Sequence, residues 1–207
     1  MKPIRMVTLA LLLPLSANGV SDEKPMLTHP SQGAMSEVSS SKAQVRRYHD
    51  GVAIKLNSTQ LLPGNVYTLW FAVMNQPHKC KKAPDFCTSN DVLKETRKTQ
   101  SDVVYAGGTV ADESGNVSFN AFIDSGQPEN FWFKTGLTNP RSAELHLIIN
   151  QHGAANTALL ASMLGSYRGG CTDQSLPAAF PDSAKTDGKP GPNTCKMVQV
   201  ARFQQHE

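Results

Sequence analysis

The sequence lacks the short motifs that identify the common classes of enzyme. It has no Gly-x-Ser-x-Gly elbow, no His-Glu-x-x-His pair, no phosphate-binding loop and no glycine fingerprint for dinucleotides. It also lacks any run near the roughly 20 apolar residues of a membrane-spanning helix. Charge is almost balanced, with 20 Lys and Arg against 17 Asp and Glu. These absences favour a non-enzymatic protein that is not integral to a membrane and has no nucleic acid as partner, although a triad of distant residues stays open.

The N-terminus has the three parts of a secretory signal peptide. Lys2 and Arg5 supply positive charge, residues 6–13 are apolar, and residues 16–19 are small enough for cleavage. We predict a signal peptide over residues 1–21, and hence a secreted or periplasmic protein.

The chain after the signal peptide has the size of one domain. About 185 residues remain, within the ~100–200 typical of a domain, and loss of the signal lowers the formal net charge from +3 to +1. Residues 22–43 are polar and aperiodic, which predicts a flexible N-terminal segment. Residues 44–207 are then predicted to form a single domain.

Four cysteines, Cys80, Cys87, Cys171 and Cys195, follow the signal peptide. In an oxidising compartment they predict two disulfides, for which three pairings are possible. We favour Cys80–Cys87 and Cys171–Cys195, the two local closures, which enclose segments rich in Pro, Asp, Ser and Lys. In the chain-entropy model these closures would stabilise the fold by about 2.5 and 3.5 kcal/mol. Free or metal-bound thiols are the alternative, although the spacing is not the Cys-x-x-Cys of common zinc and redox sites.

Alternation of apolar and polar residues predicts six strands separated by turn signals. The strands are expected within residues 44–57, 66–74, 103–111, 117–122, 143–150 and 196–203. A bulge is expected at Gly107-Gly108, and one short helix is expected over residues 154–164. This pattern predicts an all-β fold, an antiparallel Greek-key (immunoglobulin-like) β-sandwich with long loops held by disulfides.

The strand that begins near Ala143 is the most regular in the chain. One face carries only apolar residues, and these are Leu145, Leu147 and Ile149. The other face is mostly polar and carries Glu144, His146, Ile148, Asn150 and His152. The pattern predicts a central strand with one face on the core. By contrast, residues 66–74 are apolar on both faces and are expected to be buried on both sides.

Several short motifs resemble those of a family of exported bacterial proteins with no known activity. They are Leu62-Pro63-Gly64, Tyr67-Thr68-Leu69-Trp70, Asn75-Gln76-Pro77, Tyr105-Ala106-Gly107-Gly108, Pro140-Arg141-Ser142-Ala143-Glu144-Leu145-His146, His152-Gly153 and Gly169-Gly170-Cys171. The likeness runs from about residue 44 to residue 203. More distantly, the layout is similar to the chordin-type domain, in which the corresponding strand reads Ala-His-Ile-His. Here Glu144 replaces the first His, which puts a His-x-His site in doubt. The resemblance implies a secreted β-sandwich with an interaction role.

The polar face of the central strand supplies the candidate site. Glu144, His146, Asn150 and His152 are candidate ligand-binding residues, and His146, His152 and His78 are candidate metal ligands. His146 and His152 would lie about 20 Å apart on an extended strand, so they share an ion only if the strand curls. The alternative is that His146 forms a hydrogen bond within the sheet and His152 caps a turn. We therefore expect a protein that binds a partner or a cell-envelope component, with a copper or zinc protein as the alternative and no committed cofactor.

Overall fold

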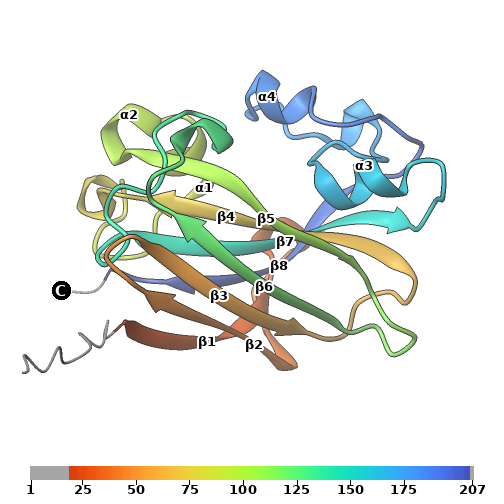
Figure 1. Ribbon diagram of the computed structural model, residues 1–207, viewed down its shortest axis with the longest axis horizontal. Coiled ribbons are helices and arrows are strands. Elements are labelled where there is room, and N and C mark those ends of the chain that lie inside the picture. Colours follow the sequence, from red (N-terminus) through yellow and green to blue (C-terminus); the bar gives the residue numbers. More distant parts are fainter. Residues whose placement is uncertain (1–18, 206–207) are drawn as a thin grey trace, which may run out of the picture.

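The computed structural model describes residues 19–205, which form one antiparallel sheet with short helices in its connections (Figure 1). The strands are β1 (Val20–Thr28), β2 (Glu37–Arg47), β3 (Gly51–Ser58), β4 (Asn65–Met74), β5 (Ser101–Val110), β6 (Val117–Asp124), β7 (Glu144–Ala154) and β8 (Lys196–Phe203). The α-helices are α1 (Ser89–Leu93), α2 (Thr96–Thr99), α3 (Leu160–Gly165) and α4 (Asp182–Lys185). The 3-10 helices are η1 (Pro30–Gln32), η2 (Pro77–Lys79), η3 (Pro128–Asn130) and η4 (Asp173–Ser175). Within the described range, no helix combines the length and the apolar composition needed to span a membrane.

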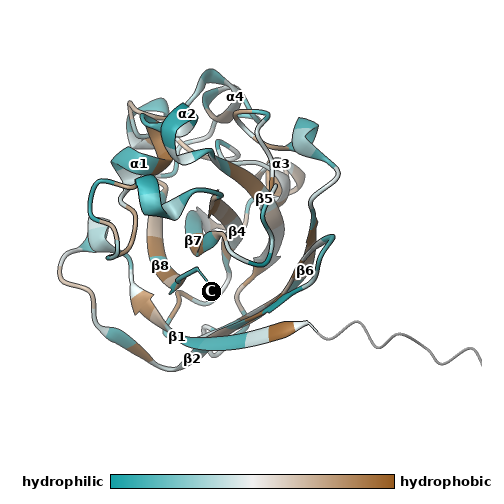
Figure 2. Cartoon of the chain, turned by 90° about the vertical axis from the view of Figure 1, so that its left-hand side faces the viewer, coloured by the Kyte–Doolittle hydropathy of each residue, from teal (hydrophilic) through white to brown (hydrophobic). Residues whose placement is uncertain are grey.

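The eight strands follow the order β5-β4-β7-β8-β1-β2-β3-β6, and all neighbours are antiparallel. Because strands twist, a sheet of this width curls, and the strands surround a common interior (Figure 2). The edge strands β5 and β6 approach each other beside the hairpin turn at residues 111–116. The all-β class is therefore confirmed. The Greek-key sandwich is not confirmed, because one continuous sheet contains all eight strands.

The inner face of the sheet holds the main hydrophobic core. Leu145, Leu147 and Ile149 of β7 are fully buried there, on the face that their alternation predicts. Leu69 and Phe71 of β4 are also fully buried in this core. The interior is thus filled by side chains, and the polar face of β7 lies on the outside of the sheet.

A second hydrophobic cluster covers the outer face of β4, which confirms that this strand is buried on both sides. Its centre is Trp70, whose ring centroid lies 5.2 Å from those of both Trp132 and Tyr167. The long connections at residues 75–100 and 155–195 contribute the cover, and Figure 2 shows α1 to α4 gathered on this one side of the sheet. The outer face of β7 is therefore sheltered by loops.

The segment at residues 22–43, which was predicted to be flexible, contains most of β1 and the start of β2. The two strands pair from Val20 opposite Arg47 onward. The inward positions of β2 include Ser41 and Ala43. Because these buried side chains are small and one is polar, the sequence of β2 does not show a clear alternation of apolar and polar residues. Residues 1–18 of the predicted signal peptide lie outside the described residues.

A tight turn precedes β4, and the bulge predicted in β5 is confirmed. The Asn65 N–H donates to the Leu62 carbonyl at 3.2 Å and Gly64 has φ 71°, as a type II turn requires. The register of β5 slips next to Gly107, which is the expected bulge. The helix predicted over residues 154–164 is α3, but it begins later because β7 continues to Ala154.

Both predicted disulfides, Cys80–Cys87 and Cys171–Cys195, are present. The loop at residues 131–139 is held instead by a buried carboxylate. Asp102 accepts backbone N–H bonds from Phe133, Thr135 and Gly136 at 2.7 to 2.9 Å. This loop places Trp132 in the outer cluster.

Candidate functional site

The four predicted ligand-binding residues all lie on β7 and are all buried. Asn150 and His152 are 0% exposed, Glu144 is 3% exposed and His146 is 8% exposed. Their contacts divide them into two groups. Asn150 and His152 bond to each other, whereas Glu144 and His146 form a separate pair toward the start of the strand.

His152 is held by hydrogen bonds to neighbouring segments. Its Nδ1 lies 2.8 Å from the carbonyl oxygen of Gly169, which can only accept, so Nδ1 carries a proton. Its Nε2 lies 2.7 Å from Oγ1 of Thr68, which accepts a bond from Trp70 Nε1–H at 2.8 Å. Burial lowers the pKa of His152 to about 4, against the Gly169 bond, which raises it. The neutral ring thus accepts from Thr68 and links β4 and β7 to the Gly169 segment.

His152 also lies beside the second disulfide, with its Nδ1 3.4 Å from Cys171 Sγ. In residues 19–205, His152, Cys171 and Cys195 form the one group of three or more His, Cys, Asp or Glu residues whose ligand atoms lie within 4.8 Å of one another. The two sulfur atoms are bonded together, and both nitrogens of His152 are engaged. The oxidised protein therefore offers no thiolate and no free imidazole nitrogen here, and His146 is not part of this group.

The third candidate metal ligand, His78, lies exposed on η2. The nearby soft ligands are used elsewhere. Met74 is fully buried in the outer cluster and Cys80 is in a disulfide. In residues 19–205, His78 belongs to no group of three candidate metal ligands.

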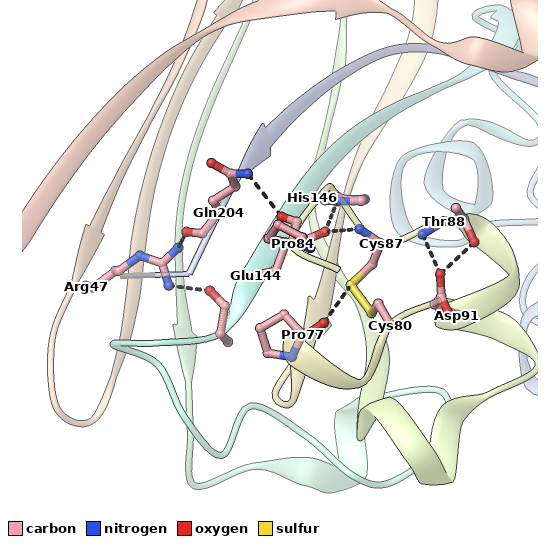
Figure 3. Close-up of polar contacts among 11 residues, drawn as sticks. Arg47, Pro77, Cys80, Pro84, Cys87, Thr88, Asp91, Glu144, His146 and Gln204 are labelled. Carbon is pink, nitrogen blue, oxygen red and sulfur yellow. Dashed lines mark hydrogen bonds and ion pairs between the residues drawn. A yellow bond between two sulfur atoms is a disulfide. The ribbon is translucent and has the colours of Figure 1, made fainter. Parts of the chain in front are cut away.

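Glu144 and His146 form a buried pair at the other end of β7 (Figure 3). Oε1 of Glu144 accepts from His146 Nε2 at 2.8 Å and from the backbone N–H of Cys87 at 2.8 Å. The second bond ties the disulfide loop of residues 80–87 to the sheet. Asp91 braces the same loop, because it accepts bonds from the backbone N–H groups of Lys81 and Thr88.

A cavity of about 840 Å³ opens beside this pair, over the outer faces of β4, β7 and β8. This volume lies within the roughly 300–1,000 Å³ of small-molecule sites. Its lining is mainly apolar and includes both tryptophans of the chain, Trp70 and Trp132, with Tyr167 and Phe180. The walls come from η1, from the disulfide loop together with α1, and from the loops that carry Trp132, Tyr167 and Phe180. Residues far apart in the sequence thus enclose a space of the size and polarity of a ligand site.

Arg202 is the main cationic group inside this cavity. It lies opposite His146 in the pairing of β7 with β8. Its guanidinium carbon lies 4.3 Å from the ring centroid of Phe86 in the disulfide loop. Its Nε is buried without a hydrogen-bond partner, and none of the ion pairs found in residues 19–205 includes it. The guanidinium is therefore stacked on an aromatic ring but has no anionic partner there.

His29, just before η1, adds a further polar group to the cavity wall. Its Nδ1 accepts the backbone N–H of Ser31 at 3.2 Å, which leaves Nε2 as the protonated nitrogen of the neutral ring. Burial, and then the charge of His146, lower the pKa of His29 to about 4. His29 is therefore neutral at physiological pH.

Sequence reasoning found Glu144 and His146 but missed Arg202, Phe86 and His29. The signal for Arg202 was present, because alternation places it on the same face as Val200, next to the apolar Ala201 and Phe203 of the opposite face. A lone arginine on such a face is either exposed or held by something it binds. His29 and Phe86 lie in loops without periodicity, so the sequence carried no comparable signal for them.

Comparison with known proteins added no family assignment, since no family model, curated protein or solved structure matched the chain. The resemblance to exported bacterial proteins and to the chordin-type domain stays a prediction.

Proposed function

We propose that this protein is a non-enzymatic binding protein that takes an amphipathic small molecule, such as a component of the cell envelope, into the cavity over β4, β7 and β8. The cavity of about 840 Å³ with its aromatic lining carries the proposal. Mostly apolar concave sites with a few convergent polar groups are the usual form of ligand pockets.

Export of the protein is part of the same proposal. Two disulfides among residues 19–205, with no free cysteine there, fit an oxidising compartment. The signal-peptide pattern of residues 1–21 supports the same location. The compartment would supply the ligand, since the outer membrane and periplasm are rich in amphipathic molecules.

The metal-binding alternative has less support. A copper or zinc site at His146 would need further ligand atoms beyond Glu144, and no such group of three includes His146 in the described part of the chain. Native mass spectrometry of the purified protein tests this directly. A stoichiometric metal adduct that a His146→Ala variant loses would favour the metal site over the small-molecule site.

Binding in the cavity can be tested with Nile red, a neutral apolar dye whose emission reports its surroundings. We expect saturable binding of one dye per chain, and at least roughly tenfold weaker binding by Trp132→Ala, because buried aromatic contacts dominate binding energy. Phe122→Ala is the matched control, since Phe122 is an exposed aromatic residue on β6, 51% exposed, that does not line this cavity. Equal binding by the wild type and by Trp132→Ala would rule out the cavity as the site.

A further inference from the structure

We propose that the ligand of the cavity is an amphipathic monocarboxylate, whose carboxylate is bound by Arg202 while its apolar body lies against the tryptophans. This inference rests on the proposed function and adds the chemical class of the ligand.

Arg202 has hydrogen-bond donors without a partner among the described residues at the cavity wall. Its guanidinium has five N–H donors in a planar fork, yet no side-chain hydrogen bond or ion pair within residues 19–205 includes it. The side chain is half-buried, and Nε is the nitrogen that is buried without a partner. Buried polar groups are nearly always satisfied, and one that is not calls for an explanation. The stack on Phe86 holds the guanidinium in place at the cavity wall. A bound anion would satisfy it.

The nearby carboxylates in the described part of the chain make no ion pair with Arg202. Oε1 of Glu144 already accepts from His146 and from the Cys87 backbone. Asp85 lines the cavity from the exposed disulfide loop and makes no ion pair with Arg202. The anion that Arg202 would pair with is therefore not supplied by these side chains.

The charges of the cavity lining favour a carboxylate ligand over a phosphate ligand. A carboxylate matches the guanidinium fork with two parallel bonds and carries a single negative charge. A phosphate monoester carries nearly two negative charges at neutral pH. Asp85 and Lys82 line the cavity from the exposed disulfide loop, so their opposite charges offset each other. Among the described residues, Arg202 is the one arginine of the lining, and a single guanidinium fits a monoanion.

The aromatic lining of the cavity determines what the apolar part of the ligand can be. Away from Arg202 the cavity is lined by Trp70, Trp132, Tyr167 and Phe180. These rings contact one another, with centroid separations from 4.8 to 5.7 Å across the cluster that also includes Tyr105. They present a continuous apolar wall and leave no separate charged subsite. An aliphatic chain or an aromatic ring system suits this wall.

The test uses three probes with the same ten-carbon chain: decanoate, methyl decanoate and decyl phosphate. Binding is measured by calorimetry at pH 7.5 to the full chain with its disulfides intact. We expect decanoate to bind roughly 10- to 100-fold more tightly than the methyl ester, since a hydrogen bond to a charged group is worth this much in affinity. Decyl phosphate is expected to bind more weakly than decanoate.

Arg202→Gln is expected to abolish the preference for decanoate over the methyl ester, and binding of Nile red by the variant shows that it is folded. Arg46→Gln is the matched control, because Arg46 is an exposed arginine on β2 that does not line the cavity. Equal binding of decanoate and the ester by the wild type, or tighter binding of decyl phosphate, would overturn the carboxylate inference alone. Failure of Nile red and of all three probes to bind would overturn the proposed function as well.

Discussion

Arg47 offers a direct test of how the polar end of the cavity is held in place. It is 0% exposed, at the end of β2 (Figure 3). Its guanidinium donates to the backbone carbonyls of Pro140 at 3.0 Å and Ala143 at 2.7 Å, just before β7, and to that of Gln204 at 3.2 Å, just after β8. The arginine therefore fixes the ends of the two strands that carry Glu144 and Arg202.

We predict that Arg47→Met lowers the free energy of unfolding by about 1–2 kcal/mol, as a balance of two larger effects. The variant leaves the buried carbonyls of Pro140 and Ala143 without a donor, at a cost of about 2 kcal/mol each. The carbonyl of Gln204, which is exposed, can turn to water. Against this, burial lowers the pKa of Arg47 from 12.5 to about 10, although Asp22 raises it. That shift corresponds to about 3 kcal/mol of unfavourable free energy for the charge, which the methionine avoids.

Urea denaturation of the oxidised protein measures the difference, with Arg46→Met as the matched control. Arg46 is the neighbouring arginine and is exposed, so its replacement is expected to change stability by less than about 0.5 kcal/mol. In thermal unfolding the deficit of Arg47→Met should appear as a melting temperature lower by about 2–8 °C. If Arg47→Met is as stable as Arg46→Met or more stable, the desolvation of the charge outweighs its three hydrogen bonds, and the clamp does not stabilise the fold.

Two further predictions concern stability at acidic pH and the removal of each disulfide. The pKa of His152 is lowered from 6.5 to about 4 in the folded state, so the unfolded chain binds the extra proton first as the pH falls. The free energy of unfolding should therefore fall between pH 6.5 and 4, and His152 should account for about 2 kcal/mol of the loss by pH 4.5. Denaturation at pH 7.5 and at pH 4.5 measures this loss. An equal loss in the His152→Gln variant would contradict the prediction. Replacing Cys80 and Cys87 by serine should cost about 2.5 kcal/mol of stability and weaken decanoate binding, because the loop carries Phe86 and bonds to Glu144 through Cys87. The Cys171→Ser, Cys195→Ser variant should lose about 3.5 kcal/mol of stability but keep the preference for decanoate over its methyl ester. Loss of that preference in this second variant alone would refute the placement of the carboxylate site beside the loop of residues 80–87.

Local patterns predicted the fold best where side chains alternate strongly. The inward face of β7 and the two-sided burial of β4 follow directly from their residues, because a strand exposes alternate side chains to opposite sides. The cysteines pair as predicted, each with its nearer neighbour in the sequence. Residues 22–43 were misjudged because Ser41 and Ala43 fill inward positions where the sheet needs small side chains.

The number of sheets was beyond local reasoning. Alternation gives the two faces of each strand but not which strands pair, and here β1 connects β8 to β2 and joins what would otherwise be two halves. Because residues 22–43 were predicted to be flexible, no strand was predicted between β8 and β2. The sandwich was predicted from the number of strands and the turns between them, and neither feature specifies which strands pair.

The cavity shows why the polar face of β7 alone could not define a site. Glu144 and His146 were identified because they lie on the strand, but the groups that give them a chemical setting come from β8, from η1 and from the disulfide loop. His152, on the same face, became a structural residue because the Gly169 segment covers it. Two histidines with the same sequence pattern therefore have different roles, and the difference lies in which loop packs over each of them. A loop that bonds to His152 closes that end of the strand, whereas the loop of residues 80–87 bonds to Glu144 and leaves the space in front of Arg202 open.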